Sequence, residues 1–181
     1  TKIKEASNLL LELVNDVLDM SKLESGEIVL EEVGFNIDKL SDETIGIVEE
    51  LAKERNIQIV EEEKSITHPY LMGSPIHVKR VLMNVLSNAI KYNKDNGFIY
   101  VSYRELESKE PSHVIIEFIC RDTGIGMSKK FQDKIFEPFA QEHMGSRSKY
   151  AGTGLGMPIA KSLVEKMGGV LVLELLVQRN T

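Results

Sequence analysis

The sequence predicts an α/β protein, a two-layer α/β sandwich with a mixed sheet that is preceded by one long helix. Residues 98–106 and 114–120 have the composition of strands, and the polar residues 107–112 join them as an antiparallel hairpin. The other strand and helix patterns do not alternate regularly along the chain, which favours a mixed sheet packed against helices. The first 24 residues carry helical periodicity over much of their circumference, which is typical of a helix inside a bundle.

Composition restricts the size and the partners of the protein. With 181 residues the chain allows one ordinary domain plus an appendage, and 42% apolar residues without Trp predict an aliphatic core. A net charge of −6 argues against a nucleic-acid surface, which needs a basic excess. The sequence shows neither a membrane-spanning apolar run nor a signal peptide. Because the single cysteine, Cys120, lies within an apolar strand, we expect a buried, reduced thiol in a cytoplasmic protein without membrane contact within this chain.

The helix at residues 1–24 ends at Ser25-Gly26. The apolar residues of its seam are three and four positions apart, at Ile3, Ala6, Leu10, Leu13, Val17 and Met20. Leu9, Val14 and Leu18 widen this stripe beyond a two-stranded seam. Such a helix could dock on its own domain, but its apolar circumference requires several neighbours. We therefore expect a homodimer formed through the N-terminal helix bundle.

The remaining elements follow from the spacing of apolar residues. Further strands are expected at residues 27–35, 57–60 and 170–177, and helices at 37–55, 75–91 and 156–167. The charged residues 61–64 are expected to form a solvated turn. Ser74 and Pro75 suit the N-cap and the first position of the helix that follows them. Residues 128–155 lack a sustained period.

Asn84, Asn88 and Lys91 share one face of the helix at 75–91, because they are four and three residues apart. Two amides and an ammonium on an otherwise aliphatic helix cost free energy unless they meet solvent or a ligand. Taken alone, the stripe fits the wet face of a surface helix. The functional alternative is that an Asn oxygen ligates Mg²⁺ and that Lys91 meets a phosphate oxygen.

Directly after the strand at 114–120, the chain carries Asp122, Gly124 and Gly126. A carboxylate at the carboxyl end of a strand can accept a hydrogen bond from a ligand amine. The two glycines let the backbone approach a flat ligand without interference from Cβ atoms. A glycine-rich turn with a solvated Asp is the alternative interpretation.

A second glycine-rich stretch, Gly152–Met157, opens the last helix. Backbone N–H groups at such a helix start can bind an anion, whereas a flexible helix cap is the alternative. The stretch is neither a Walker loop, since no Gly-Lys-Ser/Thr follows, nor a dinucleotide fingerprint, since no strand directly precedes it. Residues 140–151, which carry Arg147 and Lys149, could close over a bound polyphosphate.

Four motifs therefore stand in order along the chain. They are Asn84-x-x-x-Asn88-Ala89-x-Lys91-Tyr92, Asp122-x-Gly124-x-Gly126, Phe136-x-Pro138-Phe139 and Gly152-Thr153-Gly154-Leu155-Gly156. Together they resemble the ATP-binding domain of sensor histidine kinases, over nearly all of residues 27–175. Residues 15–26 resemble the second helix of that family's dimerisation bundle, and Phe-Glu-Pro-Phe-Ala-Gln resembles the hybrid-type sensor kinases. The resemblance implies a bundle helix at 1–26 and a catalytic ATP-binding domain at 27–181.

The resemblance implies an autophosphorylating protein histidine kinase of a two-component signalling system, with ATP and Mg²⁺ as cofactors. Asn84 and Lys91 would be its catalytic residues, and Lys91 would also contact the nucleotide together with Tyr92. The partners that it implies are a second copy of the chain and a response regulator or receiver domain. The chain would be the cytoplasmic part of a larger, membrane-anchored sensor.

The same resemblance assigns cofactor-binding roles. Asp122 would bind the adenine amine, with Gly124 and Gly126 flanking the base, and Asn88 would ligate Mg²⁺ beside Asn84. The remaining cofactor-binding residues would hold the phosphates under a lid, and they are Arg147, Lys149, Gly152, Thr153, Gly154, Leu155 and Gly156.

Three departures from the family pattern leave other functions open. None of the four histidines, His68, His77, His113 and His143, has the setting of the family's phosphoacceptor, so the chain is expected to lack its own acceptor and the acid that activates it. The typical C-terminal glycine turn and closing strand are missing from the sequence. Ser148 stands where the lid usually has a basic residue, with Arg147 one place earlier.

Three other function classes compete with a histidine kinase. Gyrase-type ATPases with this fold have Glu where Asn84 stands, and an amide cannot take a proton from water, so Asn84 favours phosphoryl transfer over hydrolysis. Serine kinases that act on anti-sigma partners are disfavoured by the bundle-like first helix. A non-catalytic nucleotide-binding dimerisation module agrees with the missing acceptor.

Overall fold

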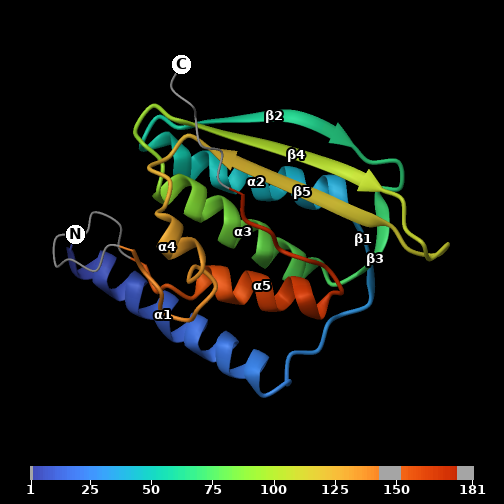
Figure 1. Cartoon of the computed structure of the whole chain (residues 1–181), viewed down its shortest axis with the longest axis horizontal. Coiled ribbons are helices and arrows are strands. Elements are labelled where there is room, and N and C mark those ends of the chain that lie inside the picture. The colour runs from blue at the N-terminus through green and yellow to red at the C-terminus, as the bar shows by residue number, and fades with distance from the viewer. Residues whose placement is uncertain (1, 143–151, 175–181) are drawn as a thin grey trace. The chain divides into compact units, whose positions relative to one another are not determined.

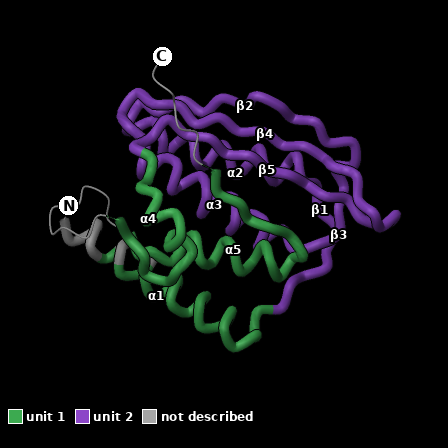
Figure 2. The backbone as a smooth tube through the Cα atoms, in the orientation of Figure 1, with its two compact units in different colours: residues 1–28, 126–181 green, residues 29–125 purple. Residues whose placement is uncertain are grey.

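The computed structural model describes residues 2–142 and 152–174, with only the backbone described for residues 2–6, 8, 9 and 12. The chain divides into two compact units, shown in Figure 2. We call residues 29–125 the sheet unit, and residues 1–28 with 126–181 the helical unit.

The sheet unit contains the predicted mixed sheet, whose strand order is β2–β4–β5. In it, β4 (Phe98–Leu106) pairs in parallel with β2 (Gln58–Ser65) and antiparallel with β5 (Ile115–Asp122). The antiparallel hairpin predicted from the sequence is thus confirmed. A separate two-stranded ladder joins β1 (Val33–Asn36) to β3 (Tyr70–Gly73) in antiparallel fashion.

Helices α2 (Ile37–Lys53) and α3 (Pro75–Lys91) cover one face of this sheet, which gives the sheet unit two layers (Figure 1). The Asn36 side chain caps α2 by accepting a hydrogen bond from Lys39 N at 2.9 Å. Between the layers lies a core that is aliphatic except for Tyr103, and its other members are Val48, Ala52, Ile57, Leu82, Leu86, Ala89, Ile90, Ile99 and Val101. Full burial of one Leu, Val or Ile contributes about 1.5–3 kcal/mol, so this core fixes the rotation of α3 and thereby the direction of its polar stripe.

The helical unit is built from α1 (Lys2–Glu24), α5 (Gly156–Lys166) and the one-turn helix α4 (Lys129–Gln132). Helix α1 packs against α5 (Figure 1), whose apolar face is buried. The Ser128 side chain caps α4, which the sequence analysis did not predict, by accepting from Phe131 N. None of the helices in the described part of the chain is both long and apolar enough to cross a membrane.

Two predicted strands are wrong in extent. Of residues 27–35, only residues 33–35 lie in a strand, which is β1 and continues to Asn36. Glu27 N instead bonds Lys22 O after the turn at Gly26, and Glu31 N donates to Ser74 Oγ at 3.2 Å. Ser74 does occupy the predicted N-cap position of α3, but its side chain makes no capping bond. Residues 170–174 of the predicted strand 170–177 lie outside any strand, and the others lie outside the described residues. In both stretches the apolar residues pair with no strand within residues 2–142 and 152–174.

The prediction of a solvated turn at residues 61–64 is also wrong. Strand β2 continues through this charged run to Ser65, with a register irregularity between Glu61 and Glu63. The charges find partners outside the strand, because Glu62 Oε1 accepts from Arg121 and Lys64 Nζ lies 2.6 Å from Asp42. Ladder pairing with β4 and these ion pairs outweigh the low strand propensity of Glu and Lys.

Candidate functional site

Helix α3 presents Asn84, Asn88 and Lys91 along one stripe, as the sequence predicts. The Asn84 Nδ2 atom is buried and has no hydrogen-bond partner within residues 2–142 and 152–174. A buried donor of this kind costs about 1–3 kcal/mol when it is unsatisfied, which is not expected on the wet face of a surface helix. At the end of the stripe, Lys91 Nζ lies 4.9 Å from the centre of the Tyr92 ring, in a cation–π contact. The stripe is therefore a candidate site for a ligand.

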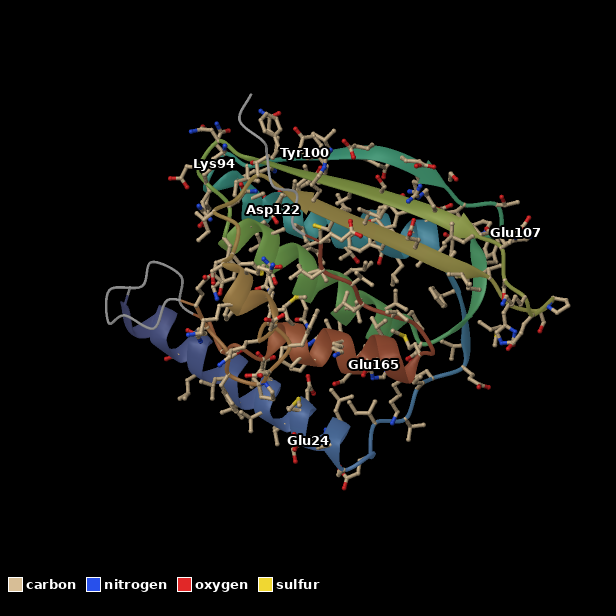
Figure 3. All side chains as sticks on the ribbon, in the orientation of Figure 1. Glu24, Lys94, Tyr100, Glu107, Asp122 and Glu165 are labelled. Atoms are coloured by element: carbon tan, nitrogen blue, oxygen red, sulfur yellow. The ribbon has the colours of Figure 1, made fainter. Side chains whose placement is uncertain are left out.

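Strand β5 ends at Asp122. This residue and Glu107, which follows β4, lie at opposite ends of the sheet's strands (Figure 3). The side chain of Asp122 is exposed, and its Oδ1 accepts a hydrogen bond from Gly124 N at 2.8 Å. This bond holds the carboxylate in a fixed orientation at the start of the turn. The second oxygen, Oδ2, makes no hydrogen bond within the part of the chain that the structure describes, so it remains available as an acceptor for a ligand amine.

The turn after Asp122 docks on the end of α3, which brings the first two sequence motifs together. Ile125 N donates to Tyr92 O at 3.0 Å. A Cβ atom on Gly124 would lie 2.4 Å from the same Tyr92 oxygen and 2.6 Å from Asp122 Oδ1. Gly124 is therefore required by contact with the chain's own backbone, a reason that differs from the predicted approach to a flat ligand. Gly126, with φ of 66°, needs glycine for its backbone conformation.

A buried amide that the sequence analysis missed connects the same elements. The Asn93 side chain is fully buried; its Nδ2 donates to Phe98 O at 3.0 Å and its Oδ1 accepts from Lys94 N at 3.0 Å. The Thr123 hydroxyl donates to Asn93 Oδ1 at 3.1 Å and accepts from Phe98 N at 2.9 Å. Asn93 thus holds the end of α3, the start of β4 and the turn after Asp122 in one hydrogen-bonded network.

Arg55, just beyond α2, caps the same end of α3. Its Nη1 donates to Ile90 O at 2.6 Å and to Lys91 O at 3.1 Å, its Nη2 donates to Asn93 O, and its Nε bonds Asp95 at 2.9 Å. The last carbonyls of a helix lack intrahelical donors, and a cation there also complements the helix dipole. In the sequence, Arg55 stands between a helical pattern and a strand, as many surface arginines do. Its role at the end of α3 was therefore not predictable from the sequence.

The glycine-rich stretch Gly152–Gly156 leads into α5 in the helical unit, and the third motif packs on it. Phe139 N donates to Gly154 O at 3.1 Å, and a Cβ on Gly154 would lie 2.9 Å from the Phe139 backbone. Gly154 also has φ of 72°, and Phe139 itself has φ of 63°, a conformation that costs a residue other than Gly about 1–3 kcal/mol. Gln141 Nε2 donates to Gly152 O at 2.6 Å. Hydrogen bonds thus join the third motif and the residues after it to the fourth motif.

Thr153 and Leu155, both expected at the phosphates, are buried. The Thr153 hydroxyl donates to Asp16 Oδ2 on α1 at 2.7 Å and accepts from Leu155 N at 3.2 Å. The predicted lid residues Arg147 and Lys149 lie outside the described residues. Cys120, expected to be buried, is half-buried in β5, and desolvation raises the pKa of its thiol to about 12, which disfavours the reactive thiolate.

Comparison with known proteins gives one family and a set of relatives. A family model described as "Histidine kinase-, DNA gyrase B-, and HSP90-like ATPase" matches residues 73–181. The chain is 33% identical over 168 residues to the signal transduction histidine-protein kinase BarA of Escherichia coli (strain K12). It is 36% identical over 167 residues to the hybrid signal transduction histidine kinase B of Dictyostelium discoideum. Each alignment covers 92% of this chain but only 18% and 8% of those proteins.

Solved structures show the same fold. Full-length ShkA in complex with AMPPNP matches with a TM-score of 0.75 and 26% identity, covering 92% of this chain and 33% of ShkA. The histidine kinase ThkA in complex with the response regulator protein TrrA matches with a TM-score of 0.68 and 25% identity, covering 92% of this chain and 43% of the matched chain. The predicted α/β sandwich with a mixed sheet is thereby confirmed.

Gly124→Ala tests the docking of the turn on α3. The added methyl group would overlap the Tyr92 carbonyl oxygen, so we expect the free energy of unfolding to fall by about 1–3 kcal/mol, the usual cost of overpacking. Gly46→Ala is the matched control, because a Cβ there has open space within helix α2 and should stabilise the protein by about 0.5–1 kcal/mol. Urea unfolding of both variants measures the difference. Equal stability of the two variants would show that Gly124 does not hold the turn against α3.

Proposed function

Because the chain belongs to the histidine kinase-, DNA gyrase B- and HSP90-like ATPase family and is homologous to sensor histidine kinases, we propose that it is the ATP-dependent catalytic part of an autophosphorylating protein histidine kinase. The observation that supports this most directly is the docking of the Asp122 turn on the Asn-bearing helix through Tyr92 O. It sets a ligand-amine acceptor and a polar amide stripe in one rigid frame. The matched relatives are several times longer than this chain. The part of the sensor that this chain represents would lie in the cytoplasm.

Within the sheet unit, Asp122 would accept a hydrogen bond from the adenine amine through Oδ2, and Gly124 would flank the base. Asn88 would ligate Mg²⁺ through its neutral side-chain oxygen, and Asn84 would turn its buried amide toward the nucleotide. These hard, uncharged oxygen and amide groups fit an ion that takes most of its ligands from phosphates and water. When bound, Mg²⁺ neutralises charge that develops on the transferred phosphoryl group. Lys91 would add positive charge, and Tyr92 would contact the ribose or phosphate.

Within the helical unit, the amides of Gly152, Thr153, Gly154, Leu155 and Gly156 would bind the phosphates. Arg147 and Lys149 would act as lid cations, and Gly126 would flank the base. Backbone N–H groups at the start of a helix suit a polyphosphate because they combine directed donors with the positive end of the helix dipole.

Residues 1–26 would belong to a dimerisation bundle, and residues 27–181 would be the catalytic domain. In support, α1 exposes between 40% and 63% of each of six apolar side chains, at Leu10, Leu11, Leu13, Val14, Val17 and Leu18. A second copy of the chain would cover such a surface. The reaction would transfer the γ-phosphoryl group of ATP to a His nitrogen on a separate bundle segment and release ADP. A response regulator or receiver domain would take the phosphoryl group next, by analogy with the ThkA–TrrA complex.

A transfer assay in trans tests this function. The chain is incubated with Mg-ATP labelled at the γ-phosphate and with a bundle fragment that carries the phosphoacceptor His. We expect acid-labile, alkali-stable label on the fragment, because the chain would bind and position the ATP and the fragment would provide the nucleophilic His. The same fragment with its His replaced by Gln is the control. Tight nucleotide binding without transfer would favour the non-catalytic dimerisation module. Phosphate release without the fragment, abolished by Asn84→Ala, would favour a gyrase-like ATPase.

Asp122→Asn tests the adenine contact. The amide exchanges an acceptor for a donor that faces the adenine amine, so nucleotide affinity should fall by about 1–3 kcal/mol. Calorimetric titration with ATP measures this, and Glu107→Gln at the other end of the sheet is the control for removal of an exposed charge. Unchanged affinity in Asp122→Asn would remove this carboxylate from the adenine site.

Asn88→Ala tests the metal contact. Loss of one Mg²⁺ ligand should weaken ATP binding in the presence of Mg²⁺ more than binding in EDTA. Ser87→Ala, a neighbour on α3 whose hydroxyl bonds Asn84 O, controls for loss of a polar group from the same helix. Titrations under both conditions give the comparison. An equal loss with and without the metal would contradict a metal role for Asn88.

A further inference from the structure

The solvent side of helix α2 carries two exposed apolar side chains, which we call the apolar pair. Its members, Ile47 and Leu51, lie one turn apart on the helix and are 43% and 51% exposed. The opposite side of α2 supplies the core with Val48 and Ala52, so the apolar pair is not needed for packing against the sheet. Single exposed apolar residues are ordinary on a protein surface, and the pair by itself does not indicate a partner.

Packing within the chain does not explain Gly46, the residue next to this pair. Gly46 is an exposed residue in the middle of α2, and a Cβ atom built on it meets no atom within 4 Å in the described part of the chain. Its φ also lies outside the left-handed region that favours glycine. Glycine inside a helix is destabilising relative to Ala. A helix position that loses stability without an internal steric reason is suited to close approach by the backbone of another molecule.

Carboxylates border the same surface. Glu43, Glu50 and Glu54 are exposed, and each lies three or four residues from a member of the apolar pair, on the adjoining surface of the helix. Two lysines of α2 pair with Glu43 and Glu50, but such exposed ion pairs are weak. Residues 37–54 carry six acidic and two basic side chains, so this surface remains negative.

The charge of this surface distinguishes between its possible occupants. An anionic lipid, a nucleic acid, or a second copy of this chain with its net charge of −6 would be repelled, whereas a basic partner would be attracted. The shape favours a helix. Two apolar side chains one turn apart beside a residue without a side chain form the kind of ridge and groove into which a second helix packs.

We propose that this surface docks a basic amphipathic helix of a partner protein. We call it the α2 face and define it by Gly46, the apolar pair and the three carboxylates of Glu43, Glu50 and Glu54. The apolar stripe of the partner helix covers the apolar pair, its backbone approaches α2 at Gly46, and its Lys or Arg side chains meet the carboxylates. This interaction goes beyond the proposed kinase function, because it requires neither nucleotide nor phosphoryl transfer.

Calorimetry with synthetic peptides tests the α2 face. The probe is a cross-linked helical peptide that carries a stripe of Leu between rows of Lys and Arg. One control peptide has the same residues in scrambled order, and the other has Glu in place of every basic residue. We expect the probe to bind at least about tenfold more tightly than either control, and its affinity to fall as salt is added.

Substitutions in the chain locate the binding. Gly46→Gln adds a side chain where the backbone of the probe approaches, and Leu51→Gln removes half of the apolar pair, so each should lower probe affinity about tenfold. Ile119→Gln on strand β5, which replaces an apolar side chain that is 39% exposed, should match the wild type. Neither α2 position is buried and Gln is a good helix former, so both variants should remain folded, which thermal unfolding verifies.

Equal binding of the three peptides, or unchanged probe affinity in either α2 variant, would overturn the proposal. So would evidence for a different occupant. Sedimentation in which Leu51→Gln lowers self-association would assign the α2 face to a second copy of the chain, and loss of binding to phosphatidylcholine vesicles in Leu51→Gln would assign it to a membrane surface. Because the phosphotransfer assay contains no basic peptide, each of these results leaves the proposed function standing.

Discussion

The carbonyl oxygen of Tyr92 is the point on which the candidate site depends. It lies one residue past the helix that carries Asn84 and Asn88, and it accepts the N–H group of Ile125 from the turn that Asp122 begins. The missing Cβ of Gly124 permits this approach. A stripe on a helix and a carboxylate on a strand thereby acquire a fixed separation. Arg55 and Asn93 stabilise the same junction from two other directions, so its geometry does not rely on a single bond.

Sequence reasoning was most successful where local signals agreed with one another. Helix α3 begins at Pro75 and ends at Lys91 as predicted, because a proline at its first position and an unbroken apolar period specify its start and its buried face. The hairpin of β4 and β5 was also predicted, since both strands are apolar and adjacent in sequence. The family resemblance rested on four short motifs, and comparison with known proteins confirmed it.

The rest depends on contacts that local sequence does not encode. Arg55 meets the end of α3 across 35 to 38 positions, and Thr153 meets Asp16 across 137, so neither bond leaves a periodic trace in the sequence. Strand β2 pairs with β4 along its charged half as well as its apolar half, whereas residues 27–32, which also contain an apolar run, pair with no strand in the described part of the chain. The glycine at 124 was predicted correctly as a site of close approach, yet the group that approaches it within the structure is the chain's own backbone. Roles toward a nucleotide remain predictions for every site residue.

The charges of β2 bear on the solubility of the protein as well as on its fold. Along the described chain, β2 is an outer strand of its sheet, with β4 on one side only. Outer strands expose unpaired backbone groups, and a flat apolar one can recruit a strand from another molecule. Three consecutive glutamates and a lysine make such recruitment unfavourable, since stacking two copies would bring like charges together. An apolar segment of equal length would complete the ladder with β4 equally well and leave the protein prone to fibrous aggregation.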